Sequence, residues 1–83
     1  MTHDVRILLV DDFEPWRRFV ASQLQSNPGW QIICQVSDGL EAVQKAKELQ
    51  PDLIVLDIGL PNLNGIEAAT SIRKVAPLSL IHI

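Results

Sequence analysis

The chain has 83 residues, 47% of them hydrophobic and 20% charged, a balance typical of one globular domain. The formal net charge of −3 argues against direct nucleic-acid binding, because contacts to phosphate backbones require a basic face. No apolar run approaches the roughly 20 residues of a membrane span, the first residues lack a signal-peptide pattern, and the single cysteine, Cys34, permits no internal disulfide. We therefore expect a soluble cytoplasmic domain with no membrane contact.

The first predicted element is a strand at residues 5–10, where the sequence VRILLV is apolar enough for a central position in a sheet. Two carboxylates, Asp11 and Asp12, follow it directly. In open α/β sheets, ligands bind outside the carboxyl ends of the strands, so this acidic pair is a candidate site feature.

A helix is predicted next, with Pro15 in its first turn, where the missing N–H leaves no bond unmade. Asn27, Pro28 and Gly29 end it. Arg17 and Arg18 are interpreted as its solvated face. The helical spacing of its apolar side chains predicts the opposite, buried face: Trp16, Phe19, Val20 and Leu24.

A second strand is predicted at residues 30–36, with Cys34 as inert core, and both tryptophans are interpreted as packing residues. Asp38 and Glu41 then have the spacing of an N-terminal capping box. The helix that they open is predicted to turn one set of apolar side chains inward: Leu40, Val43, Ala46 and Leu49.

The strand predicted at residues 53–56, LIVL, reads as buried on both faces and runs directly into Asp57. Gly59, Pro61 and Gly65 break the following segment into a loop. Asp57 therefore belongs to the carboxyl edge of the sheet. An isolated aspartate here is also compatible with simple strand termination, and the acidic pair after the first strand is what favours a site.

A third helix opens with a second capping-box spacing, Asn64 to Glu67, and ends by about Ala76, because Pro77 disfavours helical geometry in the residue before it. A fourth strand begins at residue 80. This alternation of strands and helices predicts an α/β fold, a doubly wound parallel sheet with helices on both faces. The apolar positions of the third helix are Ile66, Ala69 and Ile72.

If the first and third strands are neighbours, Asp11, Asp12 and Asp57 gather at one edge of the sheet. Two unit charges about 5 Å apart repel by roughly 3 kcal/mol at an effective dielectric near 20, so such a cluster calls for a cation or altered protonation. Hard oxygen ligands with room for water favour Mg²⁺ over calcium or zinc. A carboxylate beside that ion is suited to accept a phosphoryl group.

Four motifs occur in order: LLVDD at residues 8–12, DGLEA at 38–42, PDLIVLD at 51–57 and LPNLNG at 60–65. Together they resemble the receiver domain of bacterial two-component response regulators, in the family's order and separations. The resemblance implies a flavodoxin-like three-layer sandwich with strand order 2-1-3-4-5. Residues 1–83 would supply the first four strands, in the order 2-1-3-4.

The resemblance also implies a role for each acidic residue. Asp57 would be the phosphoacceptor, receiving a phosphoryl group from the phosphohistidine of a sensor histidine kinase. Asp11, Asp12, Asp57 and the main-chain carbonyl of Gly59 would hold Mg²⁺. The domain would be a phosphoacceptor in a phosphorelay and not an enzyme, with at most slow self-phosphorylation and dephosphorylation.

The chain departs from the family near its end. A hydroxyl residue after the fourth strand and a lysine after the fifth would lie beyond Ile83, together with the fifth strand and fifth helix. We therefore expect one receiver domain at residues 1–83, truncated within or just after the fourth strand. Lys45, Lys47 and Lys74 lie on predicted helices and are not expected to replace the missing lysine.

Three alternatives remain open. A magnesium-dependent phosphohydrolase commonly carries a second acid two positions after the first, where this chain has Gly59. A Rossmann nucleotide-binding domain requires a glycine-rich turn, which Asp11, Asp12 and Phe13 replace. The third is a phosphorylation-incompetent receiver that acts only as a self-associating fold.

An open sheet edge predicts assembly. Without a fifth strand, the strand that begins at Leu80 would offer unpaired N–H and C=O groups to another chain. Trp16 and Phe19 would also lose part of their cover, and large exposed apolar patches are uncommon on monomers. We therefore expect a homodimer in which residues 79–83 of two chains pair or exchange.

Overall fold

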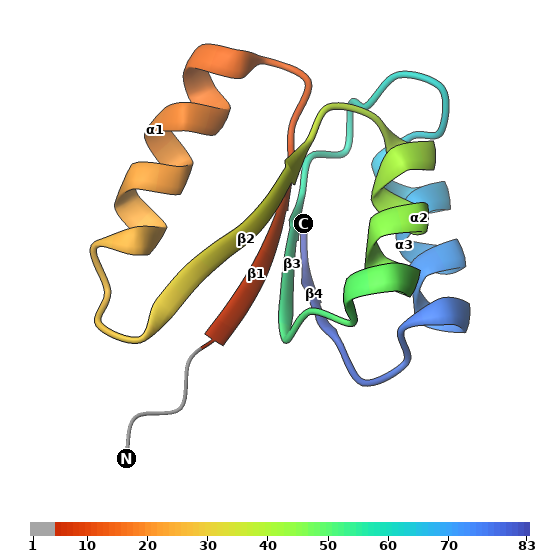
Figure 1. Cartoon of the computed structure of the whole chain (residues 1–83). Coiled ribbons are helices and arrows are strands. Elements are labelled where there is room, and N and C mark those ends of the chain that lie inside the picture. The colour runs from red at the N-terminus through yellow and green to blue at the C-terminus, as the bar shows by residue number, and fades with distance from the viewer. Residues whose placement is uncertain (1–4) are drawn as a thin grey trace.

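The computed structural model describes residues 5–83, so the first four residues of the predicted domain lie outside the described range. Strands and helices alternate along the chain (Figure 1). Among the described helices, none combines the length and the apolar character that crossing a membrane requires. The elements in chain order are β1 (Val5–Val10), α1 (Glu14–Gln25), β2 (Trp30–Val36), α2 (Gly39–Leu49), β3 (Leu53–Leu56), α3 (Gly65–Val75) and β4 (Leu80–His82).

The four strands of the described chain form one parallel sheet in the order β2-β1-β3-β4, which confirms the predicted fold class and the strand order 2-1-3-4. β1 is central and pairs with β2 and β3. Its ladder with β3 ends at the pair Val10 and Leu56. Its register with β2 shifts between Ile7 and Leu8, and Leu8 then pairs with Cys34. Because the strands are parallel, their carboxyl ends lie at one edge.

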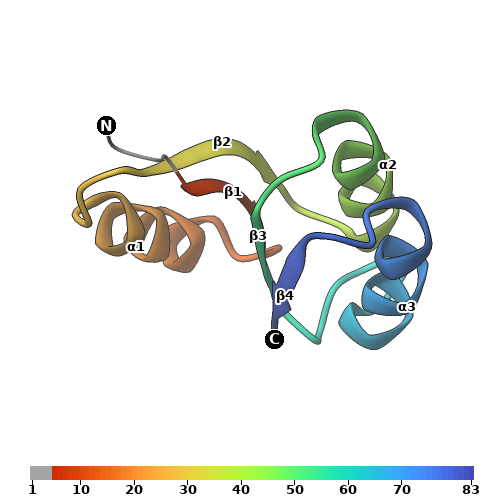
Figure 2. The same cartoon turned by 90° about the horizontal axis from the view of Figure 1, so that it is seen from below.

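Helices cover both faces of this sheet, as predicted. α1 packs against β2 and β1 on one face, and α2 and α3 pack together on the other (Figures 1 and 2). The main core lies between the sheet and the α2–α3 layer, and it excludes water from side chains that are at most 6% exposed. Its members are Leu8, Val10, Val36, Ala42, Ala46, Ile54, Leu56, Leu60, Ala68, Ile72 and Ala76.

Side-chain caps fix where the second and third helices begin. An oxygen of Asp38 accepts a hydrogen bond from the N–H of Glu41 at 2.8 Å, and the amide oxygen of Asn64 accepts from Ile66 and Glu67, each at 3.0 Å. Each cap satisfies N–H groups that have no partner within the helix. Both predicted helix starts are therefore confirmed.

Leu40, which was predicted to face the core, and Ile66, one of the apolar positions of the third helix, are both exposed. Leu40 is 59% exposed and Ile66 is 62% exposed. Each follows the first residue of its helix, and it is that glycine, Gly39 or Gly65, that is buried. One residue corresponds to a rotation of about 100° around a helix axis, so burying the glycine turns the next side chain toward solvent. Small residues such as Ala42 contact the core in place of Leu40.

The buried face of α1 is rotated by about one residue from the face that was predicted. Its most buried residue is Ala21, whereas Trp16 and Phe19 are 53% and 52% exposed and stack on each other with ring centroids 5.4 Å apart. Trp16 therefore packs on Phe19 and not in the core, and both side chains show the partial loss of cover that was expected from the sequence. Arg17 was assigned to the solvated face, but it is only half exposed, because it lies one turn before Ala21 and points toward β2.

The sheet is incompletely covered on the side of α1. On the opposite side, Cys34 in β2 is partly buried and packs against the main core, in agreement with its prediction as a core residue. A cavity of 420 Å³ opens between α1 and the strands β3 and β4, and β4 is an edge strand. Its lining is largely apolar: Val20, Leu24, Trp30, Leu53, Val55, Leu80 and His82.

Candidate functional site

The end of β1 delivers two acidic side chains to the carboxyl edge of the sheet. The N–H of Asp11 still bonds to β2, donating to the carbonyl of Val36 at 3.1 Å, so Asp11 continues the sheet geometry. Its carboxylate oxygen Oδ1 accepts a hydrogen bond from the N–H of Phe13 at 2.9 Å. Asp11 is 9% exposed, whereas Asp12, one residue further, is exposed.

The end of β3 delivers the third acid. Asp57 donates its N–H to the carbonyl of Val10 at 3.0 Å, one step beyond the pair of Val10 with Leu56. Successive side chains of a strand alternate between faces. Val10 and Leu56 enter the main core, and the carboxylates that follow them lie off it. Asp57 is therefore half buried beside the end of β1.

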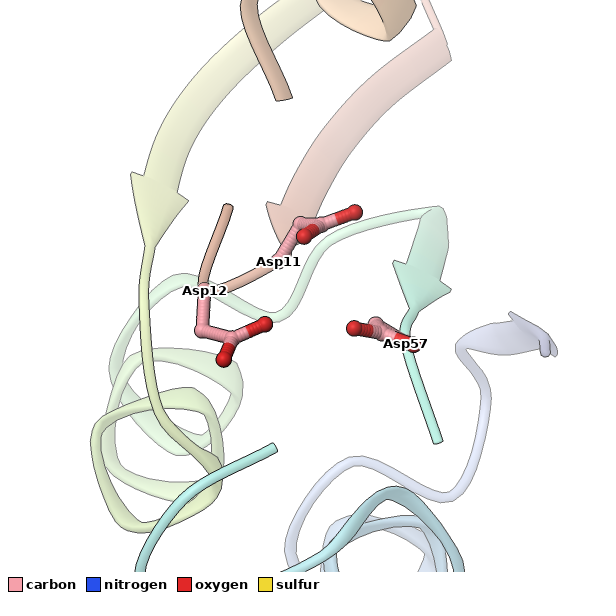
Figure 3. Close-up of side chains that lie close together, drawn as sticks. All are labelled: Asp11, Asp12 and Asp57. Carbon is pink, nitrogen blue, oxygen red and sulfur yellow. The ribbon is translucent and has the colours of Figure 1, made fainter. Parts of the chain in front are cut away.

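These three carboxylates form one cluster. One oxygen of each, from Asp11, Asp12 and Asp57, lies within 4.8 Å of the others. Figure 3 shows Asp12 and Asp57 extending toward one another from the ends of two different strands, with Asp11 beside them. The predicted convergence of these residues is confirmed as geometry.

No lysine or arginine pairs with this cluster within residues 5–83. The two ion pairs of the described chain join Arg18 to Glu14 and Lys45 to Glu48, both on helix surfaces. Three close carboxylates without a cationic side chain repel one another, and a divalent cation bound through oxygen ligands would offset that repulsion. The exposure of Asp12 leaves room for water ligands. The donor set therefore fits a hard cation.

The loop between β3 and α3 lies against the cluster. Gly59 donates its N–H to Oδ1 of Asp57 at 3.3 Å, which holds that carboxylate from the loop side. Gly65 donates to the carbonyl of Ile58 at 2.8 Å and so closes the loop. The predicted use of the Gly59 carbonyl as a ligand stays a prediction.

Two glycines allow this loop to approach the helices closely. A Cβ atom at Gly39 would lie 1.7 Å from the carbonyl oxygen of Leu63, and one at Gly65 would lie 2.5 Å from the carbonyl oxygen of Asp57. Both neighbours are main-chain atoms, which cannot rotate away. The first residues of α2 and α3 are therefore in direct backbone contact with the loop that follows Asp57.

Two of the three clustered acids line a cavity of 330 Å³. Asp11 and Asp57 line it together with Trp16 and the end of the chain at Ile83. Two carboxylates and an indole thus line one open space. Trp16 was predicted from the sequence as packing, and its place at this cavity is a feature that the sequence did not indicate.

Sequence reasoning also missed Arg17. Its guanidinium donates through Nη1 to the main-chain carbonyl of Asp11 at 2.9 Å and through Nε to Oε1 of Gln35 at 3.2 Å. A signal was present, because Arg17, Ala21 and Leu24 have the spacing of one helix face. The charge of arginine concealed that pattern.

The fold and the cluster together define a class: an open, doubly wound α/β domain with an acidic site at the carboxyl edge of its sheet. Residues 7–83 match the family described as the response regulator receiver domain. The chain belongs to the response regulator receiver domain family, the signalling module of two-component systems.

The relatives support this membership. A protein-glutamate methylesterase/protein-glutamine glutaminase of Thermotoga maritima is 46% identical over 79 residues, which are 95% of this chain and 23% of that protein. A second protein of that name, from Rhizobium etli, is 36% identical over 83 residues, all of this chain and 24% of that protein. The chain thus spans about a quarter of the length of these curated relatives.

Solved structures show the same fold. The response regulator domain of Thermotoga maritima CheB superposes with a TM-score of 0.90 at 43% identity, covering 95% of this chain and 58% of that one. The receiver domain of sensor histidine kinase PA1611 from Pseudomonas aeruginosa superposes with a TM-score of 0.84 at 31% identity, covering 94% and 64%. That domain was solved with a magnesium ion coordinated in its active site cleft.

We predict that Gly65→Ala destabilises the fold. Its Cβ would meet main-chain atoms of Asp57 and Ile58 at 2.5 Å, and such overpacking typically costs about 1–3 kcal/mol. The matched control is Gly59→Ala, whose Cβ would meet nothing within 4 Å and which should change the free energy of unfolding by less than about 0.5 kcal/mol. Urea denaturation measures both. Equal losses in the two variants would contradict the close approach at Gly65.

Proposed function

We propose that this chain is a phosphoacceptor in a two-component phosphorelay, with Asp57 as the residue that is phosphorylated. The observation that carries the proposal is the position of Asp57, half buried at the carboxyl end of β3 and within 4.8 Å of two further carboxylates. In the proposed step, a carboxylate oxygen of Asp57 attacks the phosphorus of a phosphohistidine on a sensor histidine kinase. The bond between phosphorus and the ring nitrogen breaks, the ring keeps the electron pair, and an aspartyl phosphate forms.

The proposal includes Mg²⁺, held by Asp11, Asp12, Asp57 and the main-chain carbonyl of Gly59. The support is the set of carboxylate oxygens without a cationic partner in the described chain, and the magnesium ion in the PA1611 receiver. When bound, a divalent cation neutralises charge on a transferring phosphoryl group. Asp11 and Asp12 hold it beside Asp57, and the Gly59 N–H orients the carboxylate of Asp57.

This function makes the chain a regulated component rather than the source of a catalytic activity. The relatives named as methylesterases are about four times longer than the segment that this chain matches, so their activity is not assigned to it. We propose that residues 1–83 form one receiver unit containing four of the family's strands. Its proposed location is the cytoplasm, where a free thiol such as Cys34 stays reduced.

We predict that Asp57→Asn abolishes phosphorylation. The variant keeps the shape of the side chain and removes the anionic oxygen that attacks phosphorus. The measurement is intact mass after incubation with acetyl phosphate and Mg²⁺. Asp52→Asn is the matched control, because Asp52 lies before β3 and its amide counterpart still accepts the hydrogen bond from Arg6.

The same experiment separates the alternatives. Stable addition of one phosphoryl group supports a receiver, whereas repeated turnover of the donor supports a phosphohydrolase and no reaction supports a phosphorylation-incompetent fold. Labelling of the 83-residue chain should be slow, because these residues do not include the hydroxyl and the lysine that the family uses around the phosphoryl group. Losing one electrostatic stabiliser commonly costs about a hundred- to a thousand-fold in rate. Undiminished labelling of Asp57→Asn would show that the acceptor is another residue.

We predict that Asp12→Asn weakens Mg²⁺ binding. The chain should bind Mg²⁺ or Mn²⁺ in the millimolar range, through few protein oxygens and several waters, so losing one anionic ligand should raise the dissociation constant at least tenfold. Trp16 lines the cavity beside Asp11 and Asp57, and its fluorescence reports the titration. Trp30→Phe removes the second indole signal.

Glu14→Gln is the control for this titration. It removes the same charge from an exposed position at the start of α1. The dissociation constant of this variant should stay within about twofold of the unaltered chain, because Glu14 is not one of the clustered carboxylates and its exposed charge is already paired with Arg18. Equal weakening in both variants would mean that net charge, and not ligation by Asp12, governs the affinity.

A homodimer through the β4 edge is the proposed assembly of the 83-residue chain. β4 pairs only with β3, so one side of its backbone has no strand partner within the described sheet. Leu78 and Leu80 are 96% and 67% exposed beside that edge. Pairing of two β4 strands would satisfy the free backbone groups of this edge.

We predict that light scattering at micromolar concentration finds a species of twice the 9.3 kDa chain mass. Leu80→Lys should shift this species to the monomer, because it would place two charges at the paired edge. Leu40→Lys is the control, since Leu40 is also an exposed leucine but belongs to α2, which packs on β1, β2 and α3. A folded, monodisperse 9.3 kDa species would refute the dimer.

A further inference from the structure

One arginine makes a direct contact to the main chain of the acidic cluster. Arg17 lies one turn into α1, and its Nη1 donates to the carbonyl oxygen of Asp11 at 2.9 Å. Its Nε donates to Oε1 of Gln35 in β2 at 3.2 Å. The planar guanidinium therefore bridges α1, β2 and the first residue after β1, and it uses two donors with fixed relative directions.

Together with the sheet, this bridge fixes the peptide that carries Asp12. The N–H of Asp11 donates to Val36 at 3.1 Å, and its carbonyl accepts from Arg17. The carbonyl of Asp11 belongs to the same planar peptide group as the N–H of Asp12. Holding that oxygen therefore sets the orientation of the Asp12 backbone, and through it the direction of the exposed Asp12 side chain.

The contact is directed to a carbonyl and not to a carboxylate. Arg17 makes no ion pair among those of the described chain, so it leaves the carboxylate oxygens of Asp11, Asp12 and Asp57 available for a cation. Its neighbour Arg18 has a different environment, with a side chain that is 76% exposed and paired with Glu14 at 2.9 Å. The two adjacent arginines thus have the same charge and different contacts.

We propose that Arg17 is a positioning residue for the cation site. It orients the peptide between Asp11 and Asp12 so that Asp12 points toward Asp57. This inference rests on the proposed function, because it assumes that the cluster binds Mg²⁺. A positioning role and a purely electrostatic role predict opposite changes in Mg²⁺ affinity when Arg17 is replaced. Removing the positive charge by itself would tighten cation binding, whereas losing the orientation of Asp12 would weaken it.

The test compares Arg17→Lys and Arg17→Gln with Arg18→Gln. Removing a group that orients a metal ligand typically costs about 10- to 100-fold in metal affinity, so both Arg17 variants should raise the Mg²⁺ dissociation constant about tenfold or more. Arg17→Lys keeps the charge and loses the planar fork. Arg18→Gln should leave the constant within about twofold. An unchanged or lower constant in both folded Arg17 variants would overturn the inference.

A readout without metal keeps this inference separate from the proposed function. In Arg17→Lys, the backbone amide of Asp12 should shift in the NMR spectrum and become more mobile, whereas it should stay unchanged in Arg18→Gln. Gln35→Ala removes the other hydrogen-bond partner of the guanidinium and leaves Arg17 in place. Because Gln35 is exposed, this variant should disturb the fold little and still shift the NMR signal of the Asp12 amide. If the unaltered chain binds no Mg²⁺, the metal proposal fails. The NMR signal of the Asp12 amide still tests whether Arg17 orients this peptide. An unchanged signal in Arg17→Lys would refute the positioning role.

Discussion

Parallel pairing of β1 with both β2 and β3 is the constraint on which the site depends. It makes the three strands end at one edge, and the next residues continue the same hydrogen bonding: Asp11 to Val36 and Asp57 to Val10. Two acids that are 46 positions apart in the sequence thereby become neighbours. No contact among the carboxylates themselves supplies this proximity, because like charges repel.

The packing of the sheet against α2 and α3 holds this repulsive cluster together. The core between the sheet and α2–α3 is formed by strand residues such as Val10 and Leu56, which directly precede the acids. The same backbone that is anchored in the core therefore carries the carboxylates.

Small residues determine how closely the elements around the site approach. Gly39 and Gly65 bring the starts of α2 and α3 into backbone contact with the loop after Asp57, at distances that leave no room for a Cβ atom. The capping side chains Asp38 and Asn64 fix the same two helix starts. Caps and glycines thus act on the same loop, the caps by setting where each helix begins and the glycines by allowing the approach.

The sequence by itself determined the elements, their order and the acidic edge, because these follow from local patterns: apolar runs before Asp11 and Asp57, capping residues at Asp38 and Asn64, and strict alternation of strand and helix. The inward positions Val43, Ala46 and Ile72 were also predicted correctly from helical spacing, whereas the tertiary structure alone decided the exact rotation of each helix on the sheet. It turned Leu40 to solvent and brought Arg17 to the Asp11 carbonyl, because rotation about a helix axis is set by packing partners that lie far away in the sequence.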